Sequence, residues 1–346
     1  MTFIKDILLI ALGFIVTLTS GKPVSERAQD LRVTAYIAGD QLSRSMKLDP
    51  SHFTDVTDVI LIGVCNFNTA GEVVPAPYFE DVLALVKDGM SGSGARLHLN
   101  LIGPGYVTSS TDWNEQMDDQ SDRHEQAFSS GVLEKNIKDV LDKYGFDGVF
   151  FDYEYPLTQE HWDKFDAFLL SLDAYLGDGY VLGAAISGWN TMQSKKAIAV
   201  LDMVEVMAYD IWDGDGNHAP MAETKSCIRQ MLLRGYKREQ LDLGIPFYAR
   251  PTTHDAYWYA YSGYCEDIDE NGLCTDPATG LVFSFNTPET VAEKTKWAIN
   301  KGLGGVMVWH YACDVPQDNE LSLFNAITRT KAETAANPYA VRSAVC

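Results

Sequence analysis

Two carboxylates interrupt an otherwise apolar stretch near the middle of the chain. Residues 146–156 read FDGVFFDYEYP, and Asp152 and Glu154 alternate there with Phe151 and Tyr153. Because side chains alternate along a strand, the two carboxylates would share one face, roughly 7 Å apart along it. Burying a carboxylate is costly unless it has a partner or a function, and burial shifts its pKa toward values useful for proton transfer. The stretch therefore predicts an acid–base pair, and a half-exposed strand with an acidic outer face is the alternative.

Eight short apolar runs, separated by helical patterns, would position this pair. The runs are Val33–Ile37, Val59–Val64, Leu97–Ile102, Val149–Tyr153, Val181–Ile186, Val204–Met207, Leu243–Phe247 and Val306–Trp309. Continuous apolar strands are typical of a parallel sheet that is covered on both faces. Their alternation with helices predicts an α/β fold, a (β/α)₈ TIM barrel, and a doubly wound open sheet is the alternative.

Helical periodicity is clearest in three segments between these runs. Apolar residues line one face over 133–144, over 162–176 and over 291–299. Thr158 is placed to cap the second helix, and Gly302 to end the third.

One segment departs from the strand–helix alternation. Residues 252–287 are rich in Tyr, Gly and Asp and poor in helical periodicity, so we expect a small inserted β-rich lobe between strand 7 and helix 7. No linker or low-complexity tract occurs, so residues 30–346 are predicted to form one catalytic barrel domain that contains this insertion.

The N-terminus predicts export. Lys5 precedes an apolar run from Ile7 to Leu18 and then small residues up to Gly21, a pattern typical of a signal peptide over 1–21. An uncleaved anchor is the alternative. We therefore expect a secreted, extracellular protein with no membrane attachment after cleavage.

Charge and cysteine content limit the partners and the compartment. A net charge of -21 and a pI near 4.6 argue against nucleic acid or an anionic membrane as partner. The six cysteines suit an oxidising compartment, and Cys265 and Cys274, which flank a turn-rich segment, are the expected disulfide. We expect a monomer.

Metal chemistry is disfavoured by the histidines. The seven histidines show no ligand spacing, and His98 and His310 are isolated in the sequence. This observation disfavours a metal-dependent phosphodiesterase built on a barrel, which is one rival function. We expect no metal and no cofactor.

Polar and aromatic side chains follow most of the predicted strands. In a barrel of this type, catalytic groups lie at the C-terminal ends of the strands. The groups at these ends are Tyr36, Phe67, Tyr155, Met207, Tyr209, Asp210, Tyr248, Arg250 and Trp309. Aromatic rings there suit a sugar, whose C–H face packs on a ring while its hydroxyl groups require hydrogen-bond partners.

In these strand-end residues the sequence resembles the family 18 glycoside hydrolases, the family of chitinases and related endo-β-N-acetylglucosaminidases. The strand-four signature, Asp-Gly-x-Asp-x-Asp-x-Glu, is matched at Asp147, Gly148, Asp152 and Glu154. Further motifs are matched at Met207, Tyr209 and Asp210, at Gly244 to Arg250, and at Gly304, Gly305, Met307 and Trp309. The matches run in the family order from about Val33 to Asp314.

The resemblance implies substrate-assisted retaining hydrolysis of β-1,4-linked N-acetylglucosamine polymers, either chitin or chitooligosaccharides. Glu154 would protonate the glycosidic oxygen, while Asp152 would hold the acetamido N–H of the sugar. Tyr209 and Asp210 would complete the catalytic group. Substrate-binding residues would be Tyr36, Phe67, Tyr155, Met207, Tyr248, Arg250 and Trp309. The alternatives are an endo-β-N-acetylglucosaminidase acting on N-glycans and a non-catalytic chitinase-like lectin.

The sequence departs from the family pattern at two strands. Phe150 stands where the family places its first Asp, and its apolar ring should desolvate Asp152 and bias it toward Glu154. We expect activity to survive with an altered pH profile. The third strand ends in residues 101–104, Leu-Ile-Gly-Pro, where the family has Ser-x-Gly-Gly, which puts sugar contacts at that edge in doubt.

Overall fold

The structure, a computed structural model, describes residues 22–45, 48, 53, 55–254 and 257–337. The predicted signal peptide, 1–21, lies outside the described residues, as does Cys346. Among the described helices, none has the length and apolar character needed to cross a membrane.

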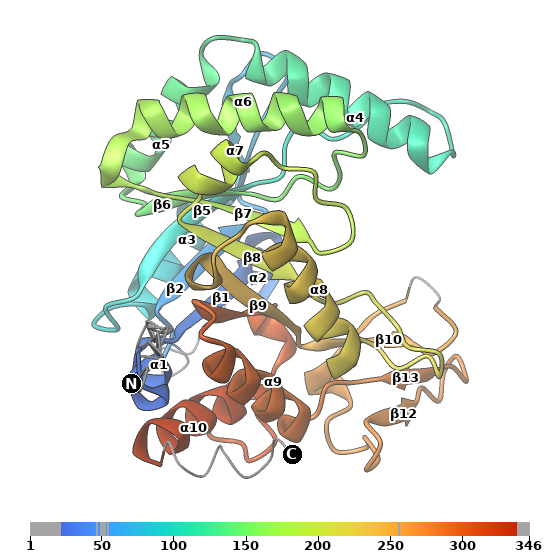
Figure 1. Cartoon of the computed structure of the whole chain (residues 1–346). Coiled ribbons are helices and arrows are strands. Elements are labelled where there is room, and N and C mark those ends of the chain that lie inside the picture. Colours follow the sequence, from blue (N-terminus) through green and yellow to red (C-terminus); the bar gives the residue numbers. More distant parts are fainter. Residues whose placement is uncertain (1–21, 46–47, 49–52, 54, 255–256, 338–346) are drawn as a thin grey trace, which may run out of the picture.

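The eight predicted apolar runs form a closed parallel barrel (Figure 1). Its strands are β1 (Arg32–Ala38), β2 (Asp58–Ile62), β5 (Arg96–Leu101), β6 (Gly148–Phe151), β7 (Val181–Ser187), β8 (Met203–Met207), β9 (Leu241–Pro246) and β14 (Gly305–Trp309). Strand β1 pairs with both β2 and β14, in the registers Ala35↔Val59 and Ala35↔Val308. That pairing closes the sheet, which confirms the barrel and excludes the open-sheet alternative.

Helices surround the barrel. They are α1 (Val24–Asp30), α2 (Gly39–Ser45), α3 (Phe79–Gly89), α4 (Trp113–Phe128), α5 (Leu133–Tyr144), α6 (Gln159–Leu176), α7 (Lys195–Val200), α8 (Met221–Arg234), α9 (Pro288–Lys301) and α10 (Leu323–Ala336). The three predicted helices are confirmed as α5, α6 and α9. Thr158 caps α6 by accepting a hydrogen bond from the His161 N–H, and Gly302, at φ 68°, ends α9. Figure 1 shows α4, α5 and α6 lying together on one side of the barrel.

Large apolar side chains fill the middle of the barrel. Phe150 is fully buried there and belongs to one cluster with Tyr36, Ile60 and Met307. The ring of Phe150 lies directly over Gly183 of β7, where a Cβ atom would come within 2.1 Å of it. A glycine at position 183 is thus what gives the phenylalanine ring its space.

A polar layer lies nearer the N-terminal ends of the strands. The buried Asp58 carboxylate accepts hydrogen bonds from Thr57 and His98, both at 2.8 Å, and forms an ion pair with Arg96 at 2.7 Å. Asp242 is likewise buried and paired with Arg32. We call this layer the barrel floor. Each of these two carboxylates has an arginine partner.

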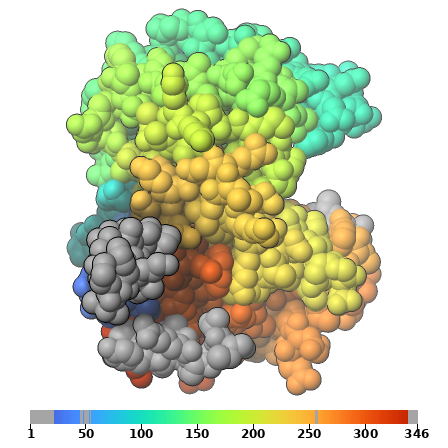
Figure 2. Space-filling model, viewed as in Figure 1, coloured from blue at the N-terminus to red at the C-terminus, as the bar shows by residue number. Residues whose placement is uncertain are grey.

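The predicted insertion is a small antiparallel sheet. It comprises β10 (Tyr248–Pro251), β11 (Tyr259–Ala260), β12 (Leu273–Thr275) and β13 (Val282–Ser284), in the order β11-β10-β13-β12. The lobe projects at the lower right in Figure 2, coloured orange. It begins at Tyr248, directly after β9, so two of the predicted site residues, Tyr248 and Arg250, belong to the lobe. A second small sheet pairs β3 (Cys65–Phe67) with β4 (Val73–Pro75).

The predicted disulfide is wrong in this structure, where Cys265 and Cys274 are both free thiols. Other contacts close the segment between them. Cys274 lies on β12 and pairs with Phe283 of β13, while the Asp269 carboxylate accepts hydrogen bonds from the N–H groups of Asn271 and Leu273. The turn is therefore held by strand pairing and by a carboxylate, without a covalent link.

Candidate active site

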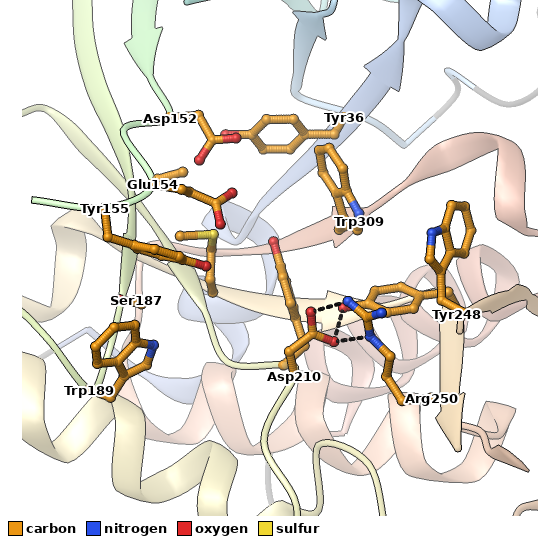
Figure 3. Close-up of a pocket in the computed structure, with 14 residues that line it drawn as sticks. Tyr36, Asp152, Glu154, Tyr155, Ser187, Trp189, Asp210, Tyr248, Arg250 and Trp309 are labelled. Atoms are coloured by element: carbon orange, nitrogen blue, oxygen red, sulfur yellow. Dashed lines mark hydrogen bonds and ion pairs between the residues drawn. The ribbon is translucent and has the colours of Figure 1, made fainter. Parts of the chain in front are cut away.

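A pocket of about 290 Å³ opens at the C-terminal ends of the barrel strands (Figure 3). It is lined by Tyr36, Asp152, Glu154, Tyr155, Ala185, Ser187, Trp189, Met207, Tyr209, Asp210, Tyr248, Arg250, Trp258 and Trp309. Every predicted site residue except Phe67 is among them. The location is the one expected for the active site of a (β/α)₈ barrel.

Asp152 and Glu154 meet inside this pocket. Strand β6 ends at Phe151, so both residues lie just beyond it, and their carboxyl groups lie next to each other in the pocket (Figure 3). The spacing of roughly 7 Å predicted along one strand does not apply to them, because the strand is shorter than expected. Two carboxyl groups this close favour a state in which one of them keeps its proton.

The surroundings of this pair favour a retained proton. Burial raises the pKa of Asp152 well above its usual range, and the neighbouring Glu154 raises it further. Burial also raises the pKa of Glu154, against the opposing effect of hydrogen bonds with Tyr155 and Asp152. Within the described residues neither carboxyl forms an ion pair. The raised pKa values therefore favour a retained proton next to an open cavity, as a general acid requires.

Contacts from α4 hold the catalytic segment in place. The Gln120 side-chain amide donates a hydrogen bond of 2.6 Å to the main-chain carbonyl of Glu154. The Tyr155 N–H donates to the Met117 sulfur at 3.3 Å. Helix α4 thus contacts both polar atoms of the peptide group that joins Glu154 to Tyr155.

The third carboxylate of the pocket, Asp210, has the opposite electrostatic character. It accepts hydrogen bonds from the Tyr248 hydroxyl at 2.6 Å and from Arg250 at 2.8 and 2.6 Å (Figure 3). His218 lies 3.2 Å from the same carboxylate. Burial alone would raise the pKa of Asp210, but Arg250, His218 and Tyr248 together hold it well below the usual range. Asp210 is therefore a fixed anion.

Aromatic rings form the inner wall. Tyr36 and Trp309 pack edge to face with ring centroids 5.3 Å apart, at the ends of the adjacent strands β1 and β14. Tyr209 lies close to Gly244 of β9, where a Cβ atom would come within 2.9 Å of its ring and 2.3 Å of the Val206 carbonyl. Glycine at position 244 therefore allows the tyrosine to lie against the barrel.

Phe67 is a wrong prediction. Its side chain is 3 % exposed and packs against His124, Phe128 and Phe151, with ring centroids 5.5, 6.1 and 6.5 Å away, beneath α4. The barrel strand β2 ends at Ile62, and Phe67 lies on the β3–β4 hairpin beyond it. The residue that closes the apolar run in sequence is thus not at the strand end in space.

The unusual end of the third strand contributes nothing to the pocket lining. Gly103, at φ 109°, exchanges two hydrogen bonds of 2.6 Å with the Asn66 side chain, and a Cβ atom there would come within 2.0 Å of His124. This segment is tied to the β3–β4 hairpin. The doubt about sugar contacts at this edge agrees with that geometry.

The sequence interpretation overlooked residues on the fifth strand end and in the lobe. Ser187 is the last residue of β7, Trp189 follows this strand, and both line the pocket, while Trp258 reaches it from the lobe. The rule applied to the other strand ends would have found Ser187 and Trp189. Trp258 carries no such signal, because its place depends on how the lobe folds back.

Comparison with known proteins assigns the family. Residues 107–314 match the family described as glycosyl hydrolases family 18. The chain belongs to this family. Its fold, with 20% sequence identity, superimposes on the GH18 chitinase ChiB from Flavobacterium johnsoniae with a TM-score of 0.69, over 88% of this chain and 94% of that one.

Similar proteins include enzymes and a lectin. Chitinase 1 of Aphanocladium album is 24% identical over 218 residues, which are 48% of this chain and 52% of that protein. The chain spans about half the length of the curated relatives it matches. A chitinase-like agglutinin from Robinia pseudoacacia shares the fold with a TM-score of 0.67 at 16% identity, over 86% of this chain and 99% of that one.

Proposed function

We propose that this protein is a glycoside hydrolase that cleaves β-1,4 linkages between N-acetylglucosamine residues, in chitin or chitooligosaccharides, with retention of configuration. The observation that carries the proposal is the buried Asp152–Glu154 pair, whose raised pKa values favour a retained proton, in a pocket with an aromatic wall. The family includes proteins named as chitinases, which supports the same substrate class.

In the first half of the proposed reaction, Glu154 gives its proton to the glycosidic oxygen, and the bond from that oxygen to C1 breaks. The carbonyl oxygen of the sugar's own N-acetyl group bonds to C1 and forms an oxazolinium ion, as an exception to the two-carboxylate scheme. Asp152 accepts a hydrogen bond from the acetamido N–H and stabilises the positive charge. The departing sugar leaves with the proton from Glu154.

In the second half, water attacks C1 from the side that the leaving sugar vacated. Glu154, now ionised, takes a proton from this water, and the bond between C1 and the acetyl oxygen breaks. The Tyr209 hydroxyl would hold the acetyl oxygen, and Trp309 would carry the apolar face of the reacting ring. Asp210, kept ionised by Arg250, would anchor the sugar hydroxyl groups as a hydrogen-bond acceptor.

The experiment that tests this proposal compares the wild type with Glu154→Gln on chitooligosaccharides. We expect wild-type turnover with products that first appear as the β-anomer, and a loss of about 10³-fold or more in kcat for the variant. Inverted products, or equal rates for the two proteins, would refute the mechanism. Oligosaccharide binding without turnover by the wild type would identify a lectin.

Substrate choice and secretion belong to the same proposal. A high-mannose glycopeptide assayed in parallel tests the endo-β-N-acetylglucosaminidase alternative, which predicts cleavage within its chitobiose core. We also propose that the chain is secreted, on the basis of the apolar run from Ile7 to Leu18, and that it is a monomer. Expression of the full chain, followed by fractionation and light scattering, tests both statements.

A further inference from the structure

Trp189 is a large apolar side chain left exposed at the pocket. It is 58% exposed, although it lines the pocket beside Tyr155, with the two ring centroids 5.3 Å apart. In Figure 3 Trp189 and Trp309 lie on opposite sides of Glu154. The proton donor therefore stands between two indole rings that come from different strand ends.

The loop that carries Trp189 is anchored on both sides. The Asn190 side-chain amide donates a hydrogen bond of 3.0 Å to the Pro156 carbonyl, which joins the loop to the catalytic segment. Gly188 packs against α8 so closely that a Cβ atom there would come within 2.8 Å of the Cys227 Cβ. The indole is thus presented from a fixed backbone, which lowers the entropy cost of stacking a ligand on it.

The same indole also lines a second hollow, of about 420 Å³. Trp189 lines both hollows, and the second one runs along α8. Its polar lining consists of Glu223, Ser226, Gln230 and Arg234. Within the described part of the chain, these four side chains have neither a hydrogen-bond nor an ion-pair partner. Their donors and acceptors are available to a ligand.

We propose that Trp189 is the platform for the sugar on the leaving-group side of the scissile bond, and that the hollow along α8 binds the next sugar. The inference rests on the proposed function. The scissile oxygen must lie at Glu154, so the ring held at Trp309 and the ring leaving the enzyme lie on opposite sides of it. The second of these sides is where Trp189 stands.

The chemistry of the two surfaces matches a β-linked N-acetylhexosamine oligosaccharide. The indole offers an apolar face for the C–H groups of one ring, and the carboxylate, hydroxyl, amide and guanidinium groups of α8 can bind hydroxyl and acetamido groups of the next. The substrate class is therefore a chain with at least two sugars beyond the cleaved bond. Such a chain gains binding energy that a short glycoside cannot.

The test measures kcat and KM over chitooligosaccharides of increasing length, for the wild type, Trp189→Ala, Trp189→Phe and the pair Ser226→Ala/Gln230→Ala. Trp113→Ala is the matched control, since Trp113 is 46% exposed on α4 and lines neither hollow. The oxazoline of chitobiose serves as a substrate with no leaving sugar. Melting curves establish that all variants fold.

We expect Trp189→Ala to lower kcat/KM for long oligosaccharides about tenfold, mainly through KM, with partial rescue by Trp189→Phe. Oxazoline hydrolysis should match that of the control. The Ser226→Ala/Gln230→Ala pair should weaken only the longer substrates. If Trp189→Ala and Trp113→Ala behave alike at every length, the inference is wrong while the hydrolase proposal stands.

A binding measurement distinguishes failure of the Trp189 inference from failure of the proposed hydrolase function. Calorimetry with the Glu154→Gln protein and a chitopentaose ligand should show weaker affinity when Trp189→Ala is added. Unchanged affinity overturns the platform. If the wild type cleaves nothing, the proposed function fails, and the same titration still decides whether Trp189 binds the oligosaccharide.

Discussion

Carboxylates are buried both at the pocket and at the barrel floor, but their neighbours differ. Asp58, at the floor, is fully buried, and although burial opposes ionisation, His98, Arg96 and Thr57 hold its pKa below the usual range. Asp152, at the pocket, is almost as buried, yet its nearest charged neighbour is another carboxyl, and its pKa is raised. Burial is thus common to Asp58 and Asp152, and their neighbours decide in which direction the pKa moves, although at the same floor burial raises the pKa of Asp242 despite its partner Arg32.

Asp210 shows that the neighbours of a carboxyl group matter more for its pKa than the end of the barrel at which it lies. It lines the same pocket as Asp152 but is paired with Arg250, and its pKa is held low. The pocket therefore combines a pair of carboxyl groups with raised pKa values and a carboxylate whose pKa is lowered. Environments that push the pKa values of neighbouring carboxyl groups apart in this way allow one group to act as an acid and another as a fixed charge in the same site.

The largest effect should come from Asp152→Asn. We expect a loss of at least about 10²-fold in kcat, because the carboxylate that would stabilise the charged intermediate is gone. The free energy of unfolding, in contrast, should increase. Because the folded-state pKa of Asp152 is raised, its ionisation costs the folded state free energy once the pH exceeds the unfolded-state pKa.

Asp152→Asn should accordingly be more stable than the wild type at pH 7, by about 1 kcal/mol, and the gain should shrink as the pH falls toward the ordinary carboxyl range and be absent below it. Urea unfolding at several pH values measures this difference. An Asp152→Asn protein that is less stable at pH 7 would contradict the contrast between pocket and floor.

Asp58→Asn should do the reverse at the floor. Replacing the ionised partner of Arg96 and His98 should lower the free energy of unfolding at pH 7 by about 1–3 kcal/mol. Because the folded-state pKa of Asp58 is lowered, this stabilisation is present above its unfolded-state pKa and is lost as the pH falls through the folded-state value.

The kcat of folded Asp58→Asn should stay near that of the wild type, since Asp58 does not line the pocket. Denaturant titrations and initial rates on the same preparation give both quantities. A large loss of kcat with unchanged stability would show that the floor takes part in the chemistry.

The smallest effect should come from Phe150→Asp, which sharpens the account of the pocket pair. Phe150 lies on β6, two residues before Asp152, and burial is the leading cause of the raised pKa values of Asp152 and Glu154. A polar side chain at position 150 reduces that desolvation, so the pH–rate profile should move to lower pH by about one unit or less.

Phe150→Leu provides the matched control, because it keeps the site apolar and should leave the profile in place. Profiles of kcat/KM against pH for the three proteins make the comparison. If the Phe150→Asp and wild-type profiles superimpose, the ring does not set the acidity of the pair.

The sequence was most informative where periodicity and strand ends coincide. Apolar runs place all eight barrel strands, and the same runs end at Asp152, Asp210 and Trp309, which the barrel brings to one mouth. Phe67 escaped this rule, because β2 ends at Ile62 and the chain then enters a hairpin that no periodicity marks. A strand boundary displaced by a few residues moves an aromatic ring from a pocket into the core.

Contacts between residues that are distant in the sequence could not be predicted from local patterns. The pairing of Arg250 with Asp210 depends on how the lobe returns over the barrel, and the second hollow along α8 exists only once the Trp189 loop packs on Cys227. Local patterns carry no information about these distances. They do identify the residue types from which the pocket is built.

The close packing of Phe150 on Gly183 limits the order in which these two positions can change during evolution. While the phenylalanine is present, even the methyl group of alanine at position 183 would come within 2.1 Å of its ring. A lineage leading away from this sequence must therefore replace the ring first, and only then does position 183 become free to vary. Positions 150 on β6 and 183 on β7 must therefore change in a fixed order, although they are distant in the chain.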